Sequence, residues 1–279
     1  MEPAVILRGL AFPEAPRWDG ERLWLTDQHA GEILTVDIDG NAERVVVGID
    51  RPGGLGTLPN GTTLVVLMNE QRVCRIVHGE LELHADLSGL ASAQCNDMVV
   101  DDYGRAYVGN FGYDIEAGEP KSNAELILIE PNGDARVVSR ELIFPNGSVI
   151  TPDRDTLIVA ETFASRISAF DIDEDGSLRN HRVWAALDDK HPDGISLDAE
   201  GAVWFACPKS AQVHRVREGG EIVHSVTPSV PPYACMLGGP ERKTLFVVGS
   251  ATNVAEEAAR TRSGTVEVID VDVPGAGIP

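Results

Sequence analysis

The sequence has few positively charged residues and no long apolar run. Lys and Arg number 23 against 44 Asp and Glu, which gives a formal charge of −21 at pH 7. Nucleic acids and anionic membranes attract basic faces, so a chain this acidic is a poor candidate for binding either of them. No apolar stretch approaches the roughly 20 residues that span a bilayer. The amino-terminal MEPAVILRGLAF also lacks the basic start and long apolar run of a signal peptide.

Cysteine and aromatic residues are scarce as well. The four cysteines (Cys74, Cys95, Cys207 and Cys235) form no CxxC pair and have no histidine at zinc-finger spacing. This pattern favours free thiols over disulfides. Aromatic residues make up 5% of the chain, but hydrophobic residues make up 43%, which is enough for a sizeable core. We expect a soluble, cytoplasmic protein that is a monomer or a small homo-oligomer.

One unit is repeated six times along the chain. Each copy has a short strand, a tight turn, a strongly apolar strand, a polar loop and an alternating strand such as RISAFDID. Equivalent second residues follow one another at intervals of 39, 43, 50, 47 and 41 residues. Strands of this size and spacing predict an all-β, six-bladed β-propeller with four antiparallel strands in each blade. Those second residues are Pro13, Pro52, Cys95, Pro145, Pro192 and Tyr233.

The six units account for almost the whole chain, which predicts a single propeller domain over residues 1–279. The sixth unit lacks a fourth strand, and the first unit is preceded by a strand without a partner. We therefore expect Ala4 to Phe12 to pair beside Gly264 to Asp272 and to complete the last blade, which removes an exposed sheet edge. The terminal VPGAGIP is expected to fray.

The repeats also place oxygen-bearing side chains in register. In a propeller the innermost strands line the central channel, and the residues that start them gather at one end of the axis. Asn146 and Asp193 each precede Gly, so each taken alone could be a turn residue. That interpretation does not explain Glu14 or the common register. The aligned positions are Glu14, Gly53, Asn96, Asn146, Asp193 and Ala234.

Carboxylate and amide oxygens without His or Cys suit a hard divalent cation. Ca²⁺ is the first choice, with Mg²⁺ and Mn²⁺ behind it and Zn²⁺ possible. Glu14 and Asp193 would balance the charge of such an ion, and Asn96 and Asn146 would add neutral ligands. Because Ca²⁺ takes six to eight oxygens, four protein ligands would leave positions for water and substrate.

At these residues the chain resembles the senescence-marker-protein and gluconolactonase family, which also contains luciferin-regenerating enzymes. A related phosphotriesterase shares its architecture. The resemblance covers nearly the whole chain and implies a six-bladed propeller with one divalent metal at the axis and hydrolysis of lactones. The stretches that carry it are FPEAPRW, CNDMVVDDYGRAYVGNFG, PNGSVITPDRDTLIVAETF and PDGISLDAEGAVWFA.

The resemblance also implies roles for single residues. It makes Glu14, Asn146 and Asp193 direct metal ligands and places Asn96 in contact with metal or substrate. It puts Asp97 beside Asn96, as a carboxylate that supports the ligands and helps to bind substrate. Sugar-lactone hydrolases of the family carry Arg two residues before that Asn, where it holds substrate hydroxyls. This chain has Gln94 there, which favours a lactone or ester with fewer hydroxyls than gluconolactone.

The mechanism expected from these charges is a metal-polarised carbonyl attacked by water, with Asp193 or Glu14 taking the proton. Three alternatives stay open: phosphotriester hydrolysis, a non-hydrolytic reaction on a natural-product intermediate, and a non-enzymatic scaffold. The chain has no GxSxG elbow, HExxH motif or phosphate-binding glycine loop. Further candidates for the site are His29, His191, Phe163, Tyr113 and Met68, with residues 113–123 as a lid or a plain surface loop.

Overall fold

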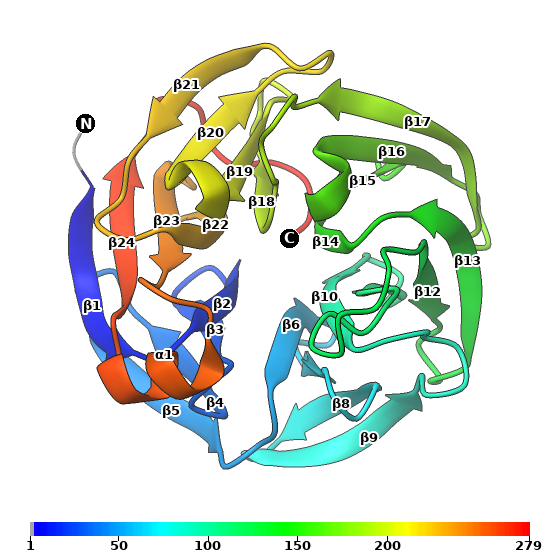
Figure 1. Ribbon diagram of the computed structural model, residues 1–279, viewed down its shortest axis with the longest axis horizontal. Helices are drawn as coiled ribbons and strands as arrows, with labels where there is room; N and C mark the ends of the chain where they lie inside the picture. Colours follow the sequence, from blue (N-terminus) through cyan, green and yellow to red (C-terminus); the bar gives the residue numbers. More distant parts are fainter. Residues whose placement is uncertain (1–2) are drawn as a thin grey trace.

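The computed structural model describes residues 3–279 and contains six four-stranded antiparallel sheets. Figure 1 shows them arranged as the blades of a ring around a central axis. The first strand of each blade contacts the first strands of the neighbouring blades, so these six strands line the axis. The predicted six-bladed β-propeller is confirmed.

The strands follow the order expected from the repeats. In blades one to five the polypeptide runs outward from the axis, and strands that follow one another in the sequence pair antiparallel. The strands of blades one to three are β2 (Pro13–Trp18), β3 (Leu23–Asp27), β4 (Glu32–Val36), β5 (Ala42–Val47), β6 (Pro52–Thr57), β7 (Thr63–Leu67), β8 (Arg72–Val77), β9 (Glu80–Asp86), β10 (Cys95–Val100), β11 (Ala106–Asn110), β12 (Ala124–Ile129) and β13 (Ala135–Leu142).

Blades four to six repeat the arrangement, with one short helix added to the sixth. The helix α1 (Ala255–Thr261) lies between β23 and β24, in an insertion where the sequence showed no convincing helical period. The strands are β14 (Pro145–Ile150), β15 (Thr156–Glu161), β16 (Arg166–Ile172), β17 (Leu178–Ala186), β18 (Ile195–Leu197), β19 (Val203–Cys207), β20 (Gln212–Val216), β21 (Ile222–Val226), β22 (Pro232–Gly238), β23 (Thr244–Gly249) and β24 (Gly264–Asp270).

The ring closes through the amino-terminal strand β1 (Ala4–Leu10). It pairs antiparallel with β24 from Ala4 opposite Val268 to Leu10 opposite Gly264, which makes it the outermost strand of blade six. Figure 1 shows the first and last strands of the chain side by side. The predicted closure is therefore confirmed, and the last blade has the same number of strands as the others.

The expectation that the carboxy-terminal segment frays is wrong. Residues 273–279 run across three blades at one end of the axis, and the chain ends near the centre of the ring in Figure 1. Ile278 exchanges two backbone hydrogen bonds with Ile150, of 2.7 and 2.9 Å, while Ala276 N–H donates to Leu197 and Gly275 N–H to Arg242. These bonds reach residues far away in sequence, so no local pattern indicates them.

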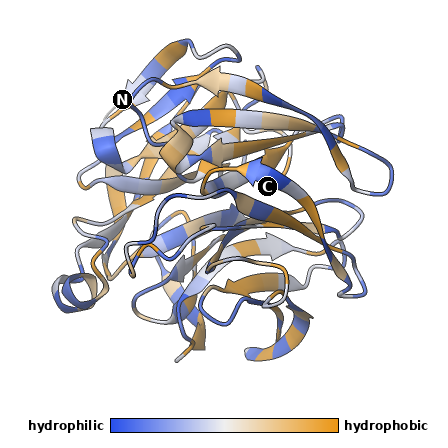
Figure 2. Cartoon of the chain, turned by 45° about the vertical axis from the view of Figure 1, so that its right-hand side comes forward, coloured by the Kyte–Doolittle hydropathy of each residue, from blue (hydrophilic) through white to orange (hydrophobic). Residues whose placement is uncertain are grey.

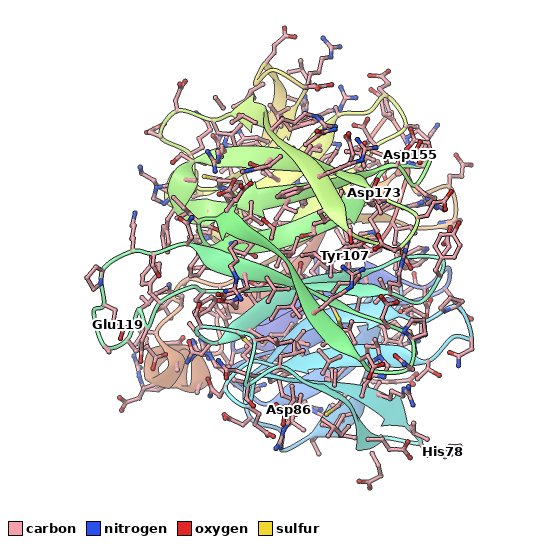
Figure 3. All side chains as sticks on the ribbon, turned by 90° about the vertical axis from the view of Figure 1, so that its right-hand side faces the viewer. His78, Asp86, Tyr107, Glu119, Asp155 and Asp173 are labelled. Atoms are coloured by element: carbon pink, nitrogen blue, oxygen red, sulfur yellow. The ribbon has the colours of Figure 1, made fainter. Side chains whose placement is uncertain are left out.

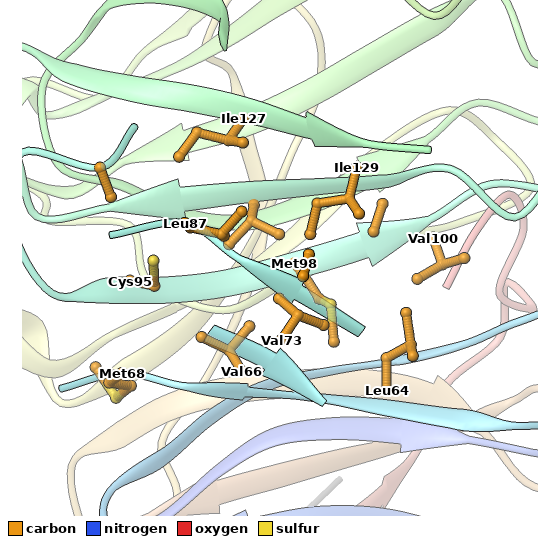
Figure 4. Packing of buried hydrophobic residues seen from close by; sticks show 14 of the residues in the cluster. Leu64, Val66, Met68, Val73, Leu87, Cys95, Met98, Val100, Ile127 and Ile129 are labelled. Atoms are coloured by element: carbon orange, nitrogen blue, oxygen red, sulfur yellow. The ribbon is translucent and has the colours of Figure 1, made fainter. Parts of the chain in front are cut away.

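The core lies within and between the blades. Its largest cluster joins blades two and three, where Leu64, Val66, Met98 and Ile127 are fully buried (Figure 4). Figure 2 shows hydrophobic residues along the strands and many hydrophilic ones in the connecting loops. All four cysteines are buried free thiols, as predicted. In residues 3–279 no helix has the length and apolarity needed to cross a membrane.

Candidate metal centre

A β-bulge re-aims the side chains at the start of the innermost strands. The pairing register shifts between Glu14 and Arg17 in β2, between Cys95 and Met98 in β10, and between Pro145 and Ser148 in β14. A bulge adds a residue to one strand and turns a side chain out of the regular alternation. The same irregularity at the same place in several blades brings Glu14, Asn96 and Asn146 to one end of the axis.

The glycines that follow Asn146 and Asp193 serve close packing. A Cβ atom on Gly147 would lie 2.5 Å from the backbone nitrogen of Ile195, and one on Gly194 would lie 2.3 Å from the Cβ of Ala234. Both contacts are with the neighbouring innermost strand. Asn146 lies inside β14, and Asp193 N–H donates to the carbonyl of Ala206 in β19 at 2.9 Å. Neither residue sits in a chain reversal.

These side chains open into a cavity of about 430 Å³. It contains all four predicted oxygen donors and the half-buried Gln94. Most of the other predicted candidates line it too, although Tyr113 does not and instead packs against Phe144. The lining residues that the sequence indicated are Glu14, Asn96, Asn146, Asp193, Gln94, His29, His191, Met68 and Phe163.

Hydrogen bonds from neighbouring blades orient the two amides. Asn96 donates its Nδ2 to the carbonyl of Pro145 at 3.1 Å, and Asn146 donates its Nδ2 to Thr162 Oγ1 at 3.1 Å. The Thr162 hydroxyl in turn donates to the carbonyl of Pro192 at 2.8 Å. Because each amide nitrogen is engaged in this way, each carbonyl oxygen remains available as a ligand.

The two carboxylates of the cavity lack a counter-charge. Asp193 is 8% exposed and Glu14 is half-buried, and neither has an ion-pair partner within residues 3–279. Desolvation raises the pKa of both groups well above its usual range, and repulsion adds to this, from Asp193 on Glu14 and from Asp97 on Asp193. Buried charges are normally paired or bound to a metal.

The donor chemistry fits a hard divalent cation. In the described part of the chain no group of three or more His, Cys, Asp or Glu side chains gathers as a metal site would. A cation at this position would therefore depend on the amide oxygens of Asn96 and Asn146 as well as on the two carboxylates. Oxygen ligands of this kind are those that Ca²⁺ and Mg²⁺ prefer.

Asp97 lies beneath the donors and is not among the residues that line the cavity. Its Oδ1 accepts hydrogen bonds from Arg17 Nη2 at 2.7 Å and from its neighbour Met98 N–H at 2.8 Å. Arg17 is only 9% exposed and also donates to the carbonyls of Leu55 and Met98. This ion pair ties blade one to blade three and places a buried positive charge close enough to Glu14 to oppose the rise of its pKa.

Several cavity residues were not predicted from the sequence, and three of them bear on the chemistry of the site. Tyr233 packs edge-on against Phe12, with ring centroids 4.5 Å apart, and burial together with Asp193 and Glu14 raises the pKa of its phenol to about 12. The phenol therefore stays protonated at neutral pH and can donate a hydrogen bond. Thr162 orients Asn146, and Arg51 pairs with Glu116 at 2.7 Å. Only Tyr233 gave a sequence clue, because most other repeats have Pro there.

The loop of residues 113–123 forms part of the cavity wall. Ile115 and Glu116 line the cavity, and Lys121 Nζ lies 4.9 Å from the centre of the Phe163 ring. Figure 3 shows Glu119 of this loop projecting on the same side of the molecule as helix α1, whereas Asp155 and Asp173 lie on the opposite side. The cavity thus opens on the face that carries the two insertions.

The chain matches the family model described as SMP-30/Gluconolactonase/LRE-like region over residues 12–251. This match spans most of the propeller. The chain belongs to the SMP-30/gluconolactonase family. The resemblance inferred from the motifs is thereby confirmed.

Relatives of this SMP-30/gluconolactonase family member match it from end to end. It is 25% identical to a 6-deoxy-6-sulfogluconolactonase of Pseudomonas putida, over 99% of this chain and 96% of the relative. It is 26% identical to the pentonolactonase XacC of Haloferax volcanii, over 94% and 91%. Among solved structures, a calcium-binding protein, regucalcin, from Agrobacterium tumefaciens superposes with a TM-score of 0.81 at 18% identity, over 99% and 95%. This last likeness shows a shared fold.

Proposed function

We propose that this chain hydrolyses a lactone, or a related ester, at the oxygen-lined end of its axis with the help of one divalent cation. Glu14, Asn96, Asn146 and Asp193 would hold the cation, and Ca²⁺ suits these ligands best. The observation that carries the proposal is the pair of carboxylates without a counter-charge, set between two amides whose nitrogens are already engaged.

The charge around the site supports a divalent ion. Glu14, Asp97 and Asp193 bring three negative charges, and Arg17 neutralises Asp97 through the 2.7 Å contact. Two negative charges remain on the cavity side, which is the number that a divalent cation balances. Names of the relatives support the reaction class, since two of them are called lactonases and a structural neighbour is called calcium-binding.

A bound divalent cation would act as a Lewis acid, which withdraws charge from a carbonyl oxygen and makes water more acidic. Asp193 or Glu14 would accept the proton that the attacking water loses as its oxygen bonds to the carbonyl carbon. Tyr233, which stays protonated, would donate a hydrogen bond to oxygen in the cavity. The ring C–O bond then breaks, the released alkoxide takes up a proton, and the product is a hydroxy acid.

A lactone panel with and without EDTA tests the proposal. Hydrolysis followed by pH-stat should fall to background after chelation and return when Ca²⁺, Mg²⁺, Mn²⁺ or Zn²⁺ is added back, with the metal content measured by mass spectrometry. A phosphotriester in the same panel tests that alternative. Lactone hydrolysis that is insensitive to EDTA would contradict the metal requirement. Turnover of the phosphotriester alone would contradict the lactonase assignment, and no turnover at all would favour a scaffold or a non-hydrolytic enzyme.

A further inference from the structure

Aromatic side chains are concentrated in the cavity although the chain has few of them. The whole sequence contains seven Phe, four Tyr and four Trp. Four of the seven Phe line this one cavity, and Tyr233 joins them. The other three Phe are buried inside the blades. A protein with so few rings has placed most of its Phe residues where a ligand would touch them. The four cavity residues are Phe12, Phe111, Phe144 and Phe163.

Three of these rings form a continuous surface on blades three and four. Phe111 stacks on Phe144 with ring centroids 4.4 Å apart, and Phe163 follows with its centroid 4.7 Å from that of Phe144. Met68 of blade two also lines the cavity and belongs to the same apolar cluster as Phe111 and Phe144. We call Met68, Phe111, Phe144 and Phe163 the aromatic wall. It provides an apolar surface in the same cavity as the oxygen donors.

Three of the polar side chains that line the cavity are already engaged. Gln94 donates its Nε2 to Asn69 Oδ1 at 3.0 Å, and Arg51 donates Nη1 to Glu116 Oε1 at 2.7 Å. The Thr162 hydroxyl donates to the carbonyl of Pro192 at 2.8 Å. A polyhydroxylated substrate would compete with these bonds for the same donors, whereas an apolar substituent would leave them intact.

Phe163 is the member of the aromatic wall whose substitution can distinguish a role in substrate binding from a role in packing. Phe111 and Phe144 are 9% and 7% exposed and pack into the core of blades two and three, so their rings have a structural use. Phe163 is only half-buried, lines the cavity and carries Lys121 against its ring. If its sole role were to support the loop of residues 113–123, its loss would change stability without changing selectivity between substrates.

We infer that the substrate carries an apolar substituent, such as an aryl or branched alkyl group, that packs on the aromatic wall while its carbonyl faces the oxygen donors. The inference rests on the proposed lactonase function and narrows its substrate class. An apolar cavity discriminates ligands by the apolar volume that it buries, about 10- to 200-fold for one methylene. A ring packed against three Phe side chains should be favoured by at least about 10-fold.

The first experiment compares three six-membered lactones on the metal-loaded protein: glucono-δ-lactone, unsubstituted δ-valerolactone and a phenyl-substituted δ-valerolactone. We expect kcat/KM to be at least about 10-fold higher for the phenyl compound than for δ-valerolactone. Gluconolactone should be the poorest of the three. The variant Phe163→Ala should lose about 10-fold on the phenyl lactone, mainly through KM, and should lose less on δ-valerolactone, which has no ring to pack on the wall.

The matched control removes a ring from the same blade but outside the cavity. Phe170 lies in β16 and is 2% exposed, and Phe170→Leu can be compared with Phe163→Leu, which makes the same chemical change at the wall. Only Phe163→Leu should alter the ratio of kcat/KM between the phenyl-substituted and the unsubstituted δ-valerolactone. A ratio that shifts equally in both variants, or in neither, would overturn the inference.

A second experiment measures binding without catalysis. A phenyl-substituted tetrahydropyran has the same ring size but no carbonyl, so it cannot be hydrolysed. Calorimetry in EDTA should show that it binds at least about 10-fold more tightly to the native chain than to Phe163→Ala. If no lactone is hydrolysed but this binding difference appears, the proposed reaction fails and the aromatic wall stands as a binding surface. Hydrolysis of gluconolactone as fast as that of the phenyl lactone would overturn the inference and leave the lactonase function intact.

Discussion

Two aspartates at opposite ends of one innermost strand are both buried but differ in their ion pairs and hydrogen bonds. Asp193 precedes β18 and Asp198 follows it, and they are 8% and 1% exposed. Asp198 accepts a hydrogen bond from Arg215 Nε at 2.7 Å and two more from the backbone N–H groups of Glu200 and Ala202. Asp193 has no ion-pair partner in the described chain, and burial raises its pKa well above the usual range.

The difference shows how one strand supports both stability and binding. At the Asp198 end every carboxylate oxygen is satisfied by groups of the same blade. Blade three repeats this, because Asp101 follows β10 and accepts from Arg105 Nε at 2.7 Å. At the Asp193 end the oxygens face a cavity. A carboxylate that is buried without a cationic partner costs stability, so it is explained by a cationic ligand that balances its charge.

The largest expected effect concerns the Asp193 end of β18, where the carboxylate has no ion-pair partner in the described chain. We call it the unsatisfied end, and the Asp198 end the satisfied end. Asp193→Ala should reduce turnover by about 10²–10³-fold, because it removes one preorganised charged group from the site. Asp193→Asn keeps a ligand oxygen but loses the charge and the base, so it should fall almost as far while retaining more metal. In EDTA neither variant should melt below the native chain, since each removes a charge that burial disfavours.

Metal analysis beside the kinetics decides whether the assigned ligands hold the ion. Glu14→Ala and Asn146→Ala should lose metal together with Asp193→Ala. Stoichiometric metal in all three variants would place the site elsewhere. A sharp fall of the melting temperature of Asp193→Ala in EDTA would show that Asp193 resembles Asp198 after all, and the contrast between the two ends would fail.

The next effect concerns the satisfied end. Within residues 3–279, Asp198→Asn leaves the buried Arg215 with only the exposed Glu200, at 2.8 Å, as an acidic partner. Breaking a buried ion pair by removing one member costs about 3–5 kcal/mol, and the retained partner argues for the lower value, about 3 kcal/mol of unfolding free energy. Urea denaturation measures the loss. Turnover per folded molecule should stay within about twofold, and a fall comparable to that of Asp193→Asn would contradict a purely structural role.

The same contrast explains what the sequence could predict. The period of 39 to 50 residues indicated the propeller and its closure, and the register brought Glu14, Asn96, Asn146 and Asp193 together. Nothing local distinguishes Asp193 from Asp198, because both stand beside turn-forming residues. Asp193 was distinguished because it shares its position in the repeats with Glu14, Asn96 and Asn146.

Contacts between blades lay outside such reasoning. Arg17 pairs with Asp97 from 80 positions away, and Gly147 is needed because a strand of the next blade approaches it. The aromatic wall joins side chains from three blades, and the sequence indicated only Met68 and Phe163 among its four members. The carboxy-terminal segment binds through backbone groups, which any sequence possesses.

A smaller effect is expected from removing the carboxy-terminal segment, which lies at the satisfied end of the axis. Ala199 N–H donates to the carbonyl of Pro274 at 2.8 Å, so the segment begins its contacts beside Asp198. Deleting residues 273–279 should cost about 1–2 kcal/mol, because the net value of each hydrogen bond is partly cancelled by the entropy of ordering the segment. The melting temperature should fall by about 2–8 °C with turnover unchanged. An unchanged melting temperature would mean that the segment contributes nothing.

The smallest expected effect comes from a substitution of Gln94, at the rim of the cavity into which the unsatisfied end opens. Gln94 lies in the cavity wall two residues before Asn96, and its Nε2 donates one hydrogen bond to Asn69 Oδ1. We propose that Gln94 biases the site against polyhydroxylated lactones. Gln94→Arg would bring five donors on a longer side chain. Some of these donors could reach the substrate even if one of them replaced the bond to Asn69. At a half-buried position such contacts should be worth about 1 kcal/mol, so the kcat/KM ratio of gluconolactone to the phenyl lactone should rise roughly 3- to 10-fold.

Gln94→Ala is the matched control for this substitution. It frees Asn69 and enlarges the rim without adding donors, so it separates the loss of Gln from the gain of Arg. Metal content should match that of the native chain in both variants, because Gln94 contributes no ligand to the proposed ion. The ratio should rise in Gln94→Arg alone. If it also rises in Gln94→Ala, space at the rim governs selectivity, and if it stays flat in both, Gln94 does not contact the substrate and selectivity lies with the aromatic wall.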